Sequence, residues 1–218
     1  MRGKLIVLEG VEGAGKTTQM SLLKDWLGSR LDYSSDQIIC TREPGGTELG
    51  QQIRSLLLTA DLEEPIAPLA ELLLYAGDRT QHIVNFIRPA LDQGKIVICD
   101  RFTDSTIAYQ GYGRNLDLNL IEQLNQIATQ GLTSDLTLWL DIDVELGLTR
   151  TQKRGKADRM EQADISFHQR VRNGFQQLAK QYPARIFQIN ADQSVEQVRS
   201  QIIAIMETKL LQWQTATN

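Results

Sequence analysis

The sequence GVEGAGKTT at residues 10–18 decides the fold of this chain. It matches the phosphate-binding pattern G-x-x-x-x-G-K-[ST] at every fixed position. The apolar residues 5–8 before it predict a buried strand, and Met20, Leu23 and Leu27 after it recur at helical spacing. Strand, glycine-rich loop and helix in this order form the context in which the pattern binds phosphate. A chance glycine turn before a helix is therefore the weaker interpretation.

The residue types in this loop predict a binding site for a nucleoside triphosphate. The glycines let the backbone curve so that successive N–H groups and the helix N-terminus point at an anion. We expect Lys16 to add a charge near the β- and γ-phosphates, and the Thr17 hydroxyl to ligate Mg²⁺. The residues expected to contact the phosphates are Gly10, Glu12, Gly13, Ala14, Gly15, Lys16, Thr17 and Thr18.

Length and composition predict one globular domain spanning residues 1–218. The formal net charge is −4, which argues against nucleic-acid or membrane-surface binding. No apolar run reaches membrane-spanning length. Cys40 and Cys99 each lie near the end of an apolar run, which favours buried thiols in a reducing compartment over a disulfide. We therefore expect a cytoplasmic protein.

Apolar runs alternate with helical patterns along the whole chain. This alternation is typical of a doubly wound five-stranded parallel sheet with helices on both faces. The predicted strands are residues 5–8, 37–40, 96–99, 136–140 and 186–189. Ligands of such sheets bind beyond the carboxyl ends of the strands, so the residues that follow each strand are the candidate site residues.

Candidate site residues follow the second strand and also lie in the helical pattern after it. Arg42 begins the sequence REPGGT at residues 42–47, where it either holds a phosphate or is a solvated arginine in a turn. In the helical pattern at residues 68–92, Tyr75 and Arg79 share one face. They either contact a base together or belong to the core. The two histidines, His82 and His168, have no sequence neighbours that suggest catalysis.

Two further segments carry candidate chemistry. The third strand ends in Asp100 and Arg101, and an Asp at this position holds Mg²⁺ in many phosphate-loop proteins. The polar stretch STIAYQG at residues 105–111 follows, either as part of the site or as a capped helix start. Residues 150–159 contain five basic residues and one acid around Gly155, which suggests a small basic lid at about residues 150–160. After the last strand, Asp192 is a candidate for the base side of the nucleotide.

Three classes of phosphate-loop protein fit this organisation to different degrees. A GTPase needs an Asn-Lys-x-Asp signature, which this chain lacks. A motor or regulatory ATPase usually has paired acids at the end of its Mg²⁺ strand, whereas Arg101 follows Asp100 here. A small kinase needs a cationic lid and a second site at the strand ends, and this sequence predicts both.

Four motifs together resemble the thymidylate kinase family, of the bacterial type, over essentially the whole chain. They are EGVEGAGKTT at residues 9–18, REPGGT at 42–47, DRF at 100–102 with STIAYQG at 105–111, and DRME at 158–161. The resemblance implies transfer of the ATP γ-phosphoryl group to dTMP, with Mg²⁺, in a homodimer packed through helices. It also implies a phosphate-loop NTPase fold.

The same resemblance implies roles for individual residues. Glu12 would contact the 3′-hydroxyl of dTMP, and Tyr75 would stack on thymine. Arg79 would donate to the thymine O4 atom, Arg101 would hold the dTMP phosphate with Arg42 nearby, and Asp100 would act with Mg²⁺. Thr106 and Gln110 would lie near the base, and Tyr109 would crowd the sugar C2′ atom. The catalytic cations would be Lys16, Arg101, Arg154 and Arg159, with Lys153 behind the last two.

Two features limit the match. The loop has no arginine, unlike one branch of the family, so lid cations would replace it. Phe102 stands where many members have His or Tyr, and it offers no hydrogen bond. The alternatives are a UMP or CMP kinase, a deoxynucleoside kinase, or a nucleotide-binding regulatory protein without transfer activity. Arg79 disfavours cytosine and Tyr109 disfavours ribose.

Overall fold

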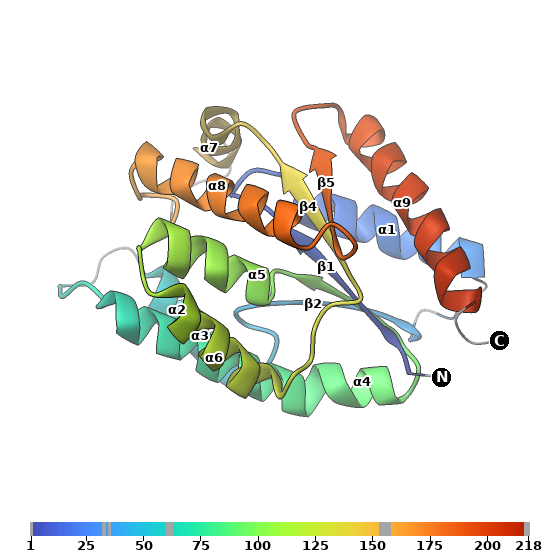
Figure 1. The fold of residues 1–218 in the computed structure, drawn as a ribbon, viewed down its shortest axis with the longest axis horizontal. Coiled ribbons are helices and arrows are strands. Elements are labelled where there is room, and N and C mark those ends of the chain that lie inside the picture. The colour runs from blue at the N-terminus through green and yellow to red at the C-terminus, as the bar shows by residue number, and fades with distance from the viewer. Residues whose placement is uncertain (1, 32–33, 35, 60–62, 153–157, 216–218) are drawn as a thin grey trace.

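The computed structural model describes residues 2–31, 34, 36–59, 63–152 and 158–215. In these residues one sheet has the strand order β2-β3-β1-β4-β5, and every pairing is parallel (Figure 1). The strands are β1 (Lys4–Glu9), β2 (Ile38–Arg42), β3 (Ile96–Asp100), β4 (Leu136–Asp141) and β5 (Ile186–Asn190). The predicted five-stranded, doubly wound parallel sheet is confirmed.

Helical segments connect the strands. They are α1 (Lys16–Leu31), α2 (Glu48–Leu58), α3 (Pro68–His82), η1 (Ile83–Ile87), α4 (Arg88–Asp92), α5 (Thr103–Thr106), η2 (Ile107–Gly113), α6 (Leu118–Thr129), α7 (Val144–Gln152), α8 (Ile165–Gln181) and α9 (Val195–Thr215). The predicted helical pattern at 68–92 forms one continuous helix with a π-helical turn, η1, in which the Arg88 N–H donates to the Ile83 carbonyl. Pro89 lacks an N–H and its ring crowds the preceding turn, so a widened turn relieves the clash.

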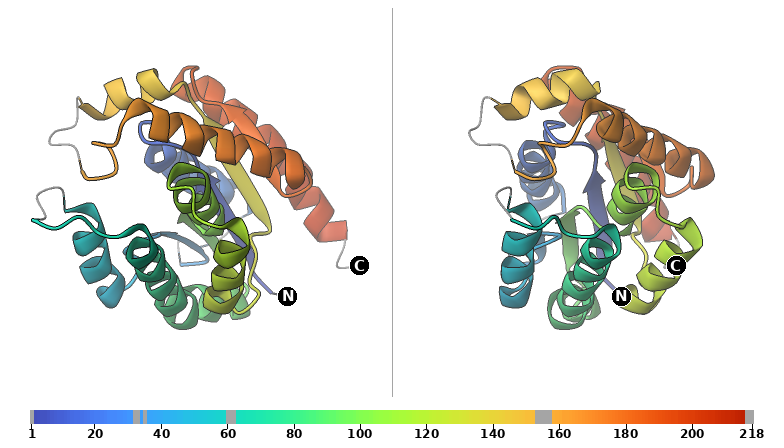
Figure 2. Two further views of the ribbon diagram at one scale, coloured as in Figure 1. Left: turned by 60° about the vertical axis from the view of Figure 1, so that its left-hand side comes forward. Right: turned by 90° about the vertical axis from the view of Figure 1, so that its left-hand side faces the viewer.

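The sheet is buried on both faces, as expected for parallel strands. Ile6 and Leu8 of β1 belong to a core cluster that includes residues of α1 and α9, whereas Leu5 and Val7 pack with η1 and α4. Figures 1 and 2 show α1 and α9 together on one side of the sheet, and α8 on the other. Alternate side chains of a strand therefore pack against helices on opposite faces of the sheet. The loops at the strand ends are not needed for this packing and can form a site.

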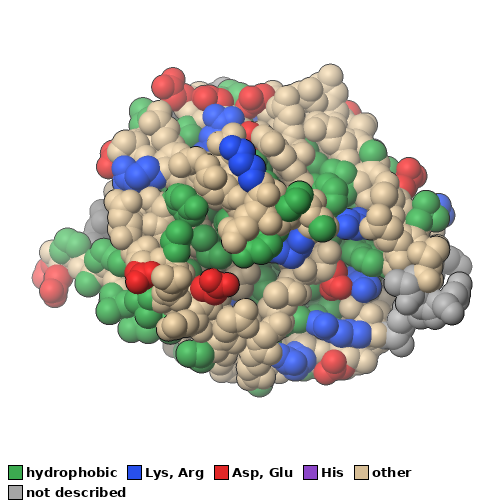
Figure 3. Space-filling model, in the orientation of Figure 1, with side chains coloured by type: hydrophobic (Ala, Val, Ile, Leu, Met, Phe, Trp, Pro, Cys, Tyr) green, Lys and Arg blue, Asp and Glu red, His purple; other side chains and the backbone are tan. Residues whose placement is uncertain are grey.

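The surface and the cysteines agree with the composition. On the face in Figure 3, acidic and basic side chains are interspersed and do not gather into one basic area. Within the described ranges, no helix has the length and hydropathy needed to cross a membrane. Cys99 is buried, Cys40 is half-buried, and both are free thiols.

Candidate active site

A cavity of about 410 Å³ lies beyond the carboxyl ends of the strands, and this volume is typical of small-molecule sites. Its walls come from the glycine-rich loop, the ends of β2 and β3, and helices α2, α3, α5, η2 and α7. The predicted site residues that line it are Glu12, Gly13, Gly15, Lys16, Thr17, Thr18, Arg42, Tyr75, Arg79, Asp100, Arg101, Thr106, Tyr109 and Gln110. The fold thus brings together residues from motifs up to about a hundred positions apart in the sequence.

The glycine-rich loop takes a conformation that only glycine adopts easily. Gly13 and Gly15 have φ angles of +74° and +89°. A Cβ atom on Gly13 would lie 2.1 Å from the Gly147 carbonyl oxygen, so the loop and α7 approach closely here. A Cβ atom on Gly15 would meet no protein atom within 4 Å, because that side of the backbone faces the cavity. The loop therefore forms an open cradle for an anion.

Lys16 lies inside this cradle. Its Nζ donates to the carbonyl oxygens of Gly10, at 3.0 Å, and Val11, at 3.1 Å. Burial, together with the positive charge of Arg101, lowers the pKa of Lys16 to about 8. A phosphate group bound in the cradle would raise the pKa of Lys16 again, because its negative charge stabilises the protonated amine that burial disfavours.

Glu12 connects the loop to the opposite wall. Its carboxylate accepts hydrogen bonds from Arg101 Nη2, at 2.6 Å, and from the Tyr109 hydroxyl, at 2.7 Å. Burial alone raises the pKa of Glu12, but Arg101 and Lys16 outweigh burial and the pKa is lowered. The guanidinium of Arg101 also lies over the Tyr109 ring, 4.8 Å from its centroid. The Glu12 carboxylate and the Arg101 guanidinium thus form an ion pair in the cavity wall, and the neutral Tyr109 hydroxyl donates to the same carboxylate.

Arg101 and Asp100 occupy the end of β3. Arg101 has a φ of +70°, a rare conformation for a residue with a side chain, and its N–H donates to the Leu8 carbonyl. The Oδ1 atom of Asp100 is buried and has no hydrogen-bond partner among the described residues. Thr17 and Asp100 line the same cavity, and a hydroxyl with one carboxylate suits Mg²⁺, which keeps waters and phosphate oxygens as its other ligands. The residues present therefore fit a magnesium–nucleotide complex.

A third arginine, which the sequence analysis did not select, joins Arg42 and Arg101 on the cavity wall. Arg54 of α2 lines the cavity, and its Nη1 donates to the Pro44 carbonyl. Burial, followed by the charges of Arg42 and Arg101, lowers the pKa of Arg54. Three like charges at one wall are unfavourable unless an anion binds between them. The available sequence signal was that Arg54 shares its helix face with the buried residues Gly50 and Leu57.

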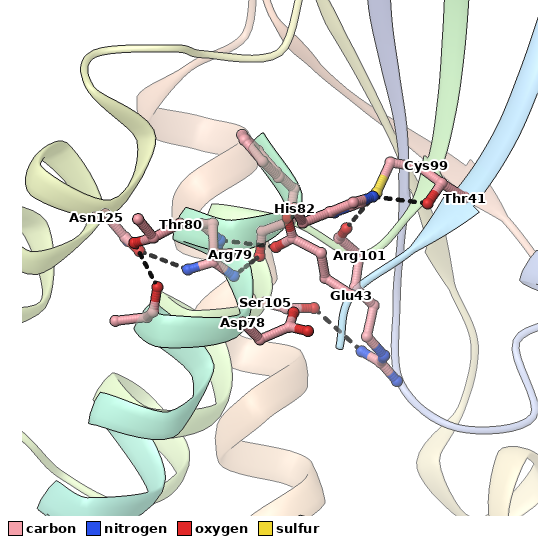
Figure 4. A network of polar contacts seen from close by, with 12 residues as sticks. Thr41, Glu43, Asp78, Arg79, Thr80, His82, Cys99, Arg101, Ser105 and Asn125 are labelled. Carbon is pink, nitrogen blue, oxygen red and sulfur yellow. Dashed lines mark hydrogen bonds and ion pairs between the residues drawn. The ribbon is translucent and has the colours of Figure 1, made fainter. Parts of the chain in front are cut away.

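Arg79 is buried in the cavity wall and is held by three protein groups (Figure 4). Its Nε donates to Glu43 Oε2 at 2.7 Å, its Nη1 to Asn125 Oδ1 at 2.8 Å, and its Nη2 to the Phe102 carbonyl at 3.0 Å. A guanidinium has five N–H donors, so one remains on each terminal nitrogen. Tyr75 lines the same region of the cavity, one helical turn away on α3.

Glu43 and His82 support Arg79 from behind, and sequence reasoning missed both. His82 Nδ1 lies 3.0 Å from Glu43 Oε1, and its Nε2 lies 2.7 Å from Thr41 Oγ1 (Figure 4). A neutral His82 with its proton on Nδ1 satisfies both contacts. The histidine therefore has a hydrogen-bond partner on each ring nitrogen.

The basic segment is only partly described. Arg154 and Lys153 lie outside the described residues. Arg159 does not line the cavity: its Nη2 donates to Glu71 Oε2 at 2.5 Å, and its Nε to the Leu57 carbonyl. Arg150 of α7 does line the cavity, and its Nη1 reaches the carbonyl oxygens of Gly13 and Ala191.

Three predicted residues, Gly10, Ala14 and Asp192, take positions outside the cavity lining. Asp192 is exposed, and its Oδ1 accepts a hydrogen bond from the Asp143 N–H at 2.9 Å, which ties the end of β5 to the start of α7. Ala14 is buried with the hydrophobic core. The stretch at residues 105–111 forms α5 and η2 and is not a loop. The π-helical turn of η2 presents Tyr109 and Gln110 side by side to the cavity.

Glu9 lies beneath the site, where a charged group is unfavourable. Its Oε1 accepts from the Phe102 and Ser105 N–H groups, and its Oε2 is 2.5 Å from the Ser105 hydroxyl. Burial, followed by the charge of Asp104, raises the pKa of Glu9 to about 7. The folded protein thus holds a proton on Glu9 that the unfolded chain has lost above pH 4.5.

We predict that Glu9→Gln stabilises the protein at pH 8. In the wild type, the contribution of Glu9 is fully present below pH 4.5 and is lost as the pH rises through about 7. Glutamine keeps the same contacts without titrating, so its advantage over the wild type grows between pH 5 and pH 8, to on the order of 2 kcal/mol. Urea unfolding at several pH values measures this difference. A difference that does not change with pH would contradict the assignment.

Comparison with known proteins agrees with this geometry. A family model described as thymidylate kinase matches residues 8–202. Thymidylate kinases from Trichodesmium erythraeum and from a Nostoc species are 58% and 55% identical to this chain, covering 98% of it and 99% and 100% of their own lengths. The crystal structure of thymidylate kinase from Ehrlichia chaffeensis superposes with a TM-score of 0.79 at 37% identity, over 94% of this chain and all of that one.

The family match spans the phosphate loop, the arginine-lined wall and the segment at 158–161, which are the motifs that carried the resemblance in the sequence. The fold and the bacterial type agree with the relatives. The resemblance is thereby confirmed, and this chain belongs to the thymidylate kinase family.

Proposed function

We propose that the protein transfers the γ-phosphoryl group of ATP to dTMP, forming dTDP and ADP. The observation that carries this proposal is that one cavity joins a triphosphate cradle to a wall of three arginines and to the pair Tyr75 and Arg79. A triphosphate and a monophosphate can therefore meet inside it. Membership in the thymidylate kinase family and the names of the close relatives support the same substrates.

The chemistry requires alignment and charge neutralisation from the protein. The dTMP phosphate oxygen is already a nucleophile, so no strong general base is needed. Two anions must instead be held in line while charge on the transferred group is neutralised. Lys16 would contact the β- and γ-phosphates, and Arg101, fixed by Glu12 and Tyr109, would hold the acceptor phosphate with Arg42 and Arg54. Thr17 and Asp100 would hold Mg²⁺, which supplies further positive charge at the phosphates.

Base and sugar recognition would use the opposite end of the cavity. Tyr75 would stack on thymine, and the two remaining N–H groups of Arg79 would donate to O4. Thr106 and Gln110 would lie near the base, Tyr109 near C2′, and Glu12 near the 3′-hydroxyl. On the donor side, Asp192 is the proposed neighbour of adenine. Arg154 remains the proposed lid cation. The contacts of Arg159 with Leu57 and Glu71 instead support a role in holding α2 and α3 in place beside the acceptor site.

An ADP-release assay tests the proposal. It uses ATP and Mg²⁺ with dTMP, dUMP, UMP, CMP and dCMP offered in parallel. We expect the fastest turnover with dTMP and poor turnover with UMP. Turnover confined to CMP or UMP would overturn the assigned acceptor, and no acceptor-dependent turnover would favour a regulatory nucleotide-binding protein.

ATP binding should take up a proton at alkaline pH. In the free protein the pKa of Lys16 is about 8, so Lys16 is mostly neutral at pH 9. A bound triphosphate favours the charged amine, so binding at pH 9 draws most of one proton from the buffer, and affinity falls as the pH rises above 8. Titration calorimetry in two buffers of different ionisation enthalpy measures this uptake. An ATP affinity that stays constant from pH 7 to pH 10 would contradict it.

We also propose that the protein is a homodimer packed through α2, α3 and α6, which lie side by side (Figure 2). Their outer faces carry large exposed apolar side chains. These are Leu49, Leu56, Leu69, Leu73, Leu118, Leu120 and Ile127. Such patches mark interfaces in soluble proteins, and a second copy would cover them.

Leu56→Glu should convert the dimer into a monomer, because each subunit would bury a carboxylate without a counter-ion in the apolar interface. Sedimentation velocity at micromolar concentration measures this change. Leu211→Glu, an equally exposed position on α9, is the control and should leave the dimer intact. A wild type that sediments as a monomer would contradict the proposal.

A further inference from the structure

Glu71 of α3 is a buried carboxylate next to the cavity, and several side chains donate hydrogen bonds to it. The side chain is fully buried, yet its carboxylate contacts three side chains from two other parts of the chain. Oε1 accepts from Gln110 Nε2 at 2.8 Å and from Arg114 Nε at 3.4 Å. Oε2 accepts from Arg159 Nη2 at 2.5 Å and from Arg114 Nη2 at 3.3 Å. Glu71 itself does not line the cavity, whereas Gln110 does.

The two arginines keep this carboxylate ionised. Burial alone would raise the pKa of Glu71, but the hydrogen bond from Gln110 and the charges of Arg114 and Arg159 lower it below its ordinary value. An ionised carboxylate can only accept hydrogen bonds. The Gln110 amide must therefore turn its NH₂ group toward Glu71.

This orientation leaves the amide oxygen of Gln110 on the cavity side. Among the described residues, that oxygen has no hydrogen-bond partner, and it is not one of the fully buried polar atoms. The base end of the cavity thus presents an acceptor from Gln110 and donors from Arg79. Thymine and uracil present the complementary pair, an N3–H donor beside the O4 acceptor. Cytosine presents the reverse, an N3 acceptor beside a 4-amino donor.

We propose that Glu71 is a positioning residue for base specificity, which fixes the Gln110 amide so that its oxygen accepts the N3–H of the acceptor base. The inference rests on the proposed function and assigns its selectivity to a residue outside the cavity. Glu71→Gln removes the constraint, because a second carboxamide can donate as well as accept, and Gln110 can then turn its NH₂ group toward the N3 atom of cytosine.

The test measures kcat/KM for dTMP, dUMP and dCMP with wild type and E71Q. We expect the preference for dTMP over dCMP to fall about tenfold or more in E71Q, the scale of one mismatched buried hydrogen bond. The ratio of dTMP to dUMP should stay unchanged, because both bases carry N3–H and O4. Glu71→Asp keeps an acceptor-only carboxylate and should retain more of the preference than E71Q does.

Two further variants separate positioning from general destabilisation. Asp104→Asn also neutralises a buried carboxylate paired with an arginine, Arg185. The hydrogen-bond partners of Asp104, Thr137 and Arg185, do not line the cavity, so the dTMP:dCMP ratio should not change. Gln110→Met keeps Glu71 and removes the amide, and it should lose the preference as E71Q does. Even if E71Q fails to fold, Q110M tests whether Gln110 reads the base, and E71D tests the constraint that Glu71 imposes on it.

An unchanged dTMP:dCMP ratio in Q110M, or in a folded E71Q, would overturn the inference while leaving the proposed function intact. An equal loss of preference in E71D and E71Q would reduce Glu71 to a structural role and would also overturn it. A wild type that does not phosphorylate dTMP would overturn both proposals.

Discussion

Replacing Lys16 by methionine is expected to lower kcat/KM by on the order of a thousandfold or more. Lys16 is buried in the cradle, and it is the cation placed by the phosphate-loop pattern where charge develops on the transferred group. Among the described residues, its Nζ makes hydrogen bonds to two backbone carbonyls and forms no ion pair, so the substitution breaks no salt bridge there. Removing a buried ammonium group should leave the melting temperature unchanged or higher.

Steady-state kinetics with ATP and dTMP, together with thermal unfolding, measure both effects. Lys24→Met is the matched control, because Lys24 lies on the same helix, two turns further on, and does not line the cavity. The control should keep wild-type turnover. If K16M retains more than a tenth of the wild-type kcat/KM, the phosphate loop does not have the role assigned to it.

Arg101→Ala should lower kcat/KM for dTMP by roughly a thousandfold, for two reasons. The acceptor phosphate would lose a bidentate cation that Glu12, Ser105 and Tyr109 hold in one orientation. Glu12 would also lose its strongest partner, and a buried carboxylate without a counter-ion rearranges or takes up a proton. Arg101→Lys should recover only part of the loss, because an ammonium group cannot reproduce the planar fork.

The measurement compares kcat and KM for dTMP with the melting temperature of each variant. Arg172→Ala is the control: Arg172 of α8 pairs with Asp141 at the end of β4 and does not line the cavity. Its activity should match the wild type. An R101A variant that keeps its activity, or that loses activity only in proportion to a loss of folded protein, would show that Arg101 does not hold the acceptor phosphate.

The sequence by itself determined the sheet and the phosphate loop. Both are local patterns: short continuous apolar runs bounded by polar residues predict strands, and fixed glycine and lysine spacing predicts a cradle. The Tyr75 and Arg79 pair could be placed on one helix face for the same reason, because helical spacing alone sets that relation. The sequence also predicted that the motif residues after the strands line one cavity, because the carboxyl ends of parallel strands meet at one edge of the sheet.

Only the tertiary structure decided which polar residues support the site. Arg54, Glu43 and Glu71 looked like ordinary members of a helix or a turn, since their partners lie between 10 and 88 positions away along the chain. The orientation of the Gln110 amide depends on a carboxylate from another helix and on two arginines that keep it ionised. Sequence patterns report the periodicity of burial, whereas charge state and hydrogen-bond direction depend on which groups meet in space, and these contacts form only when the chain is folded.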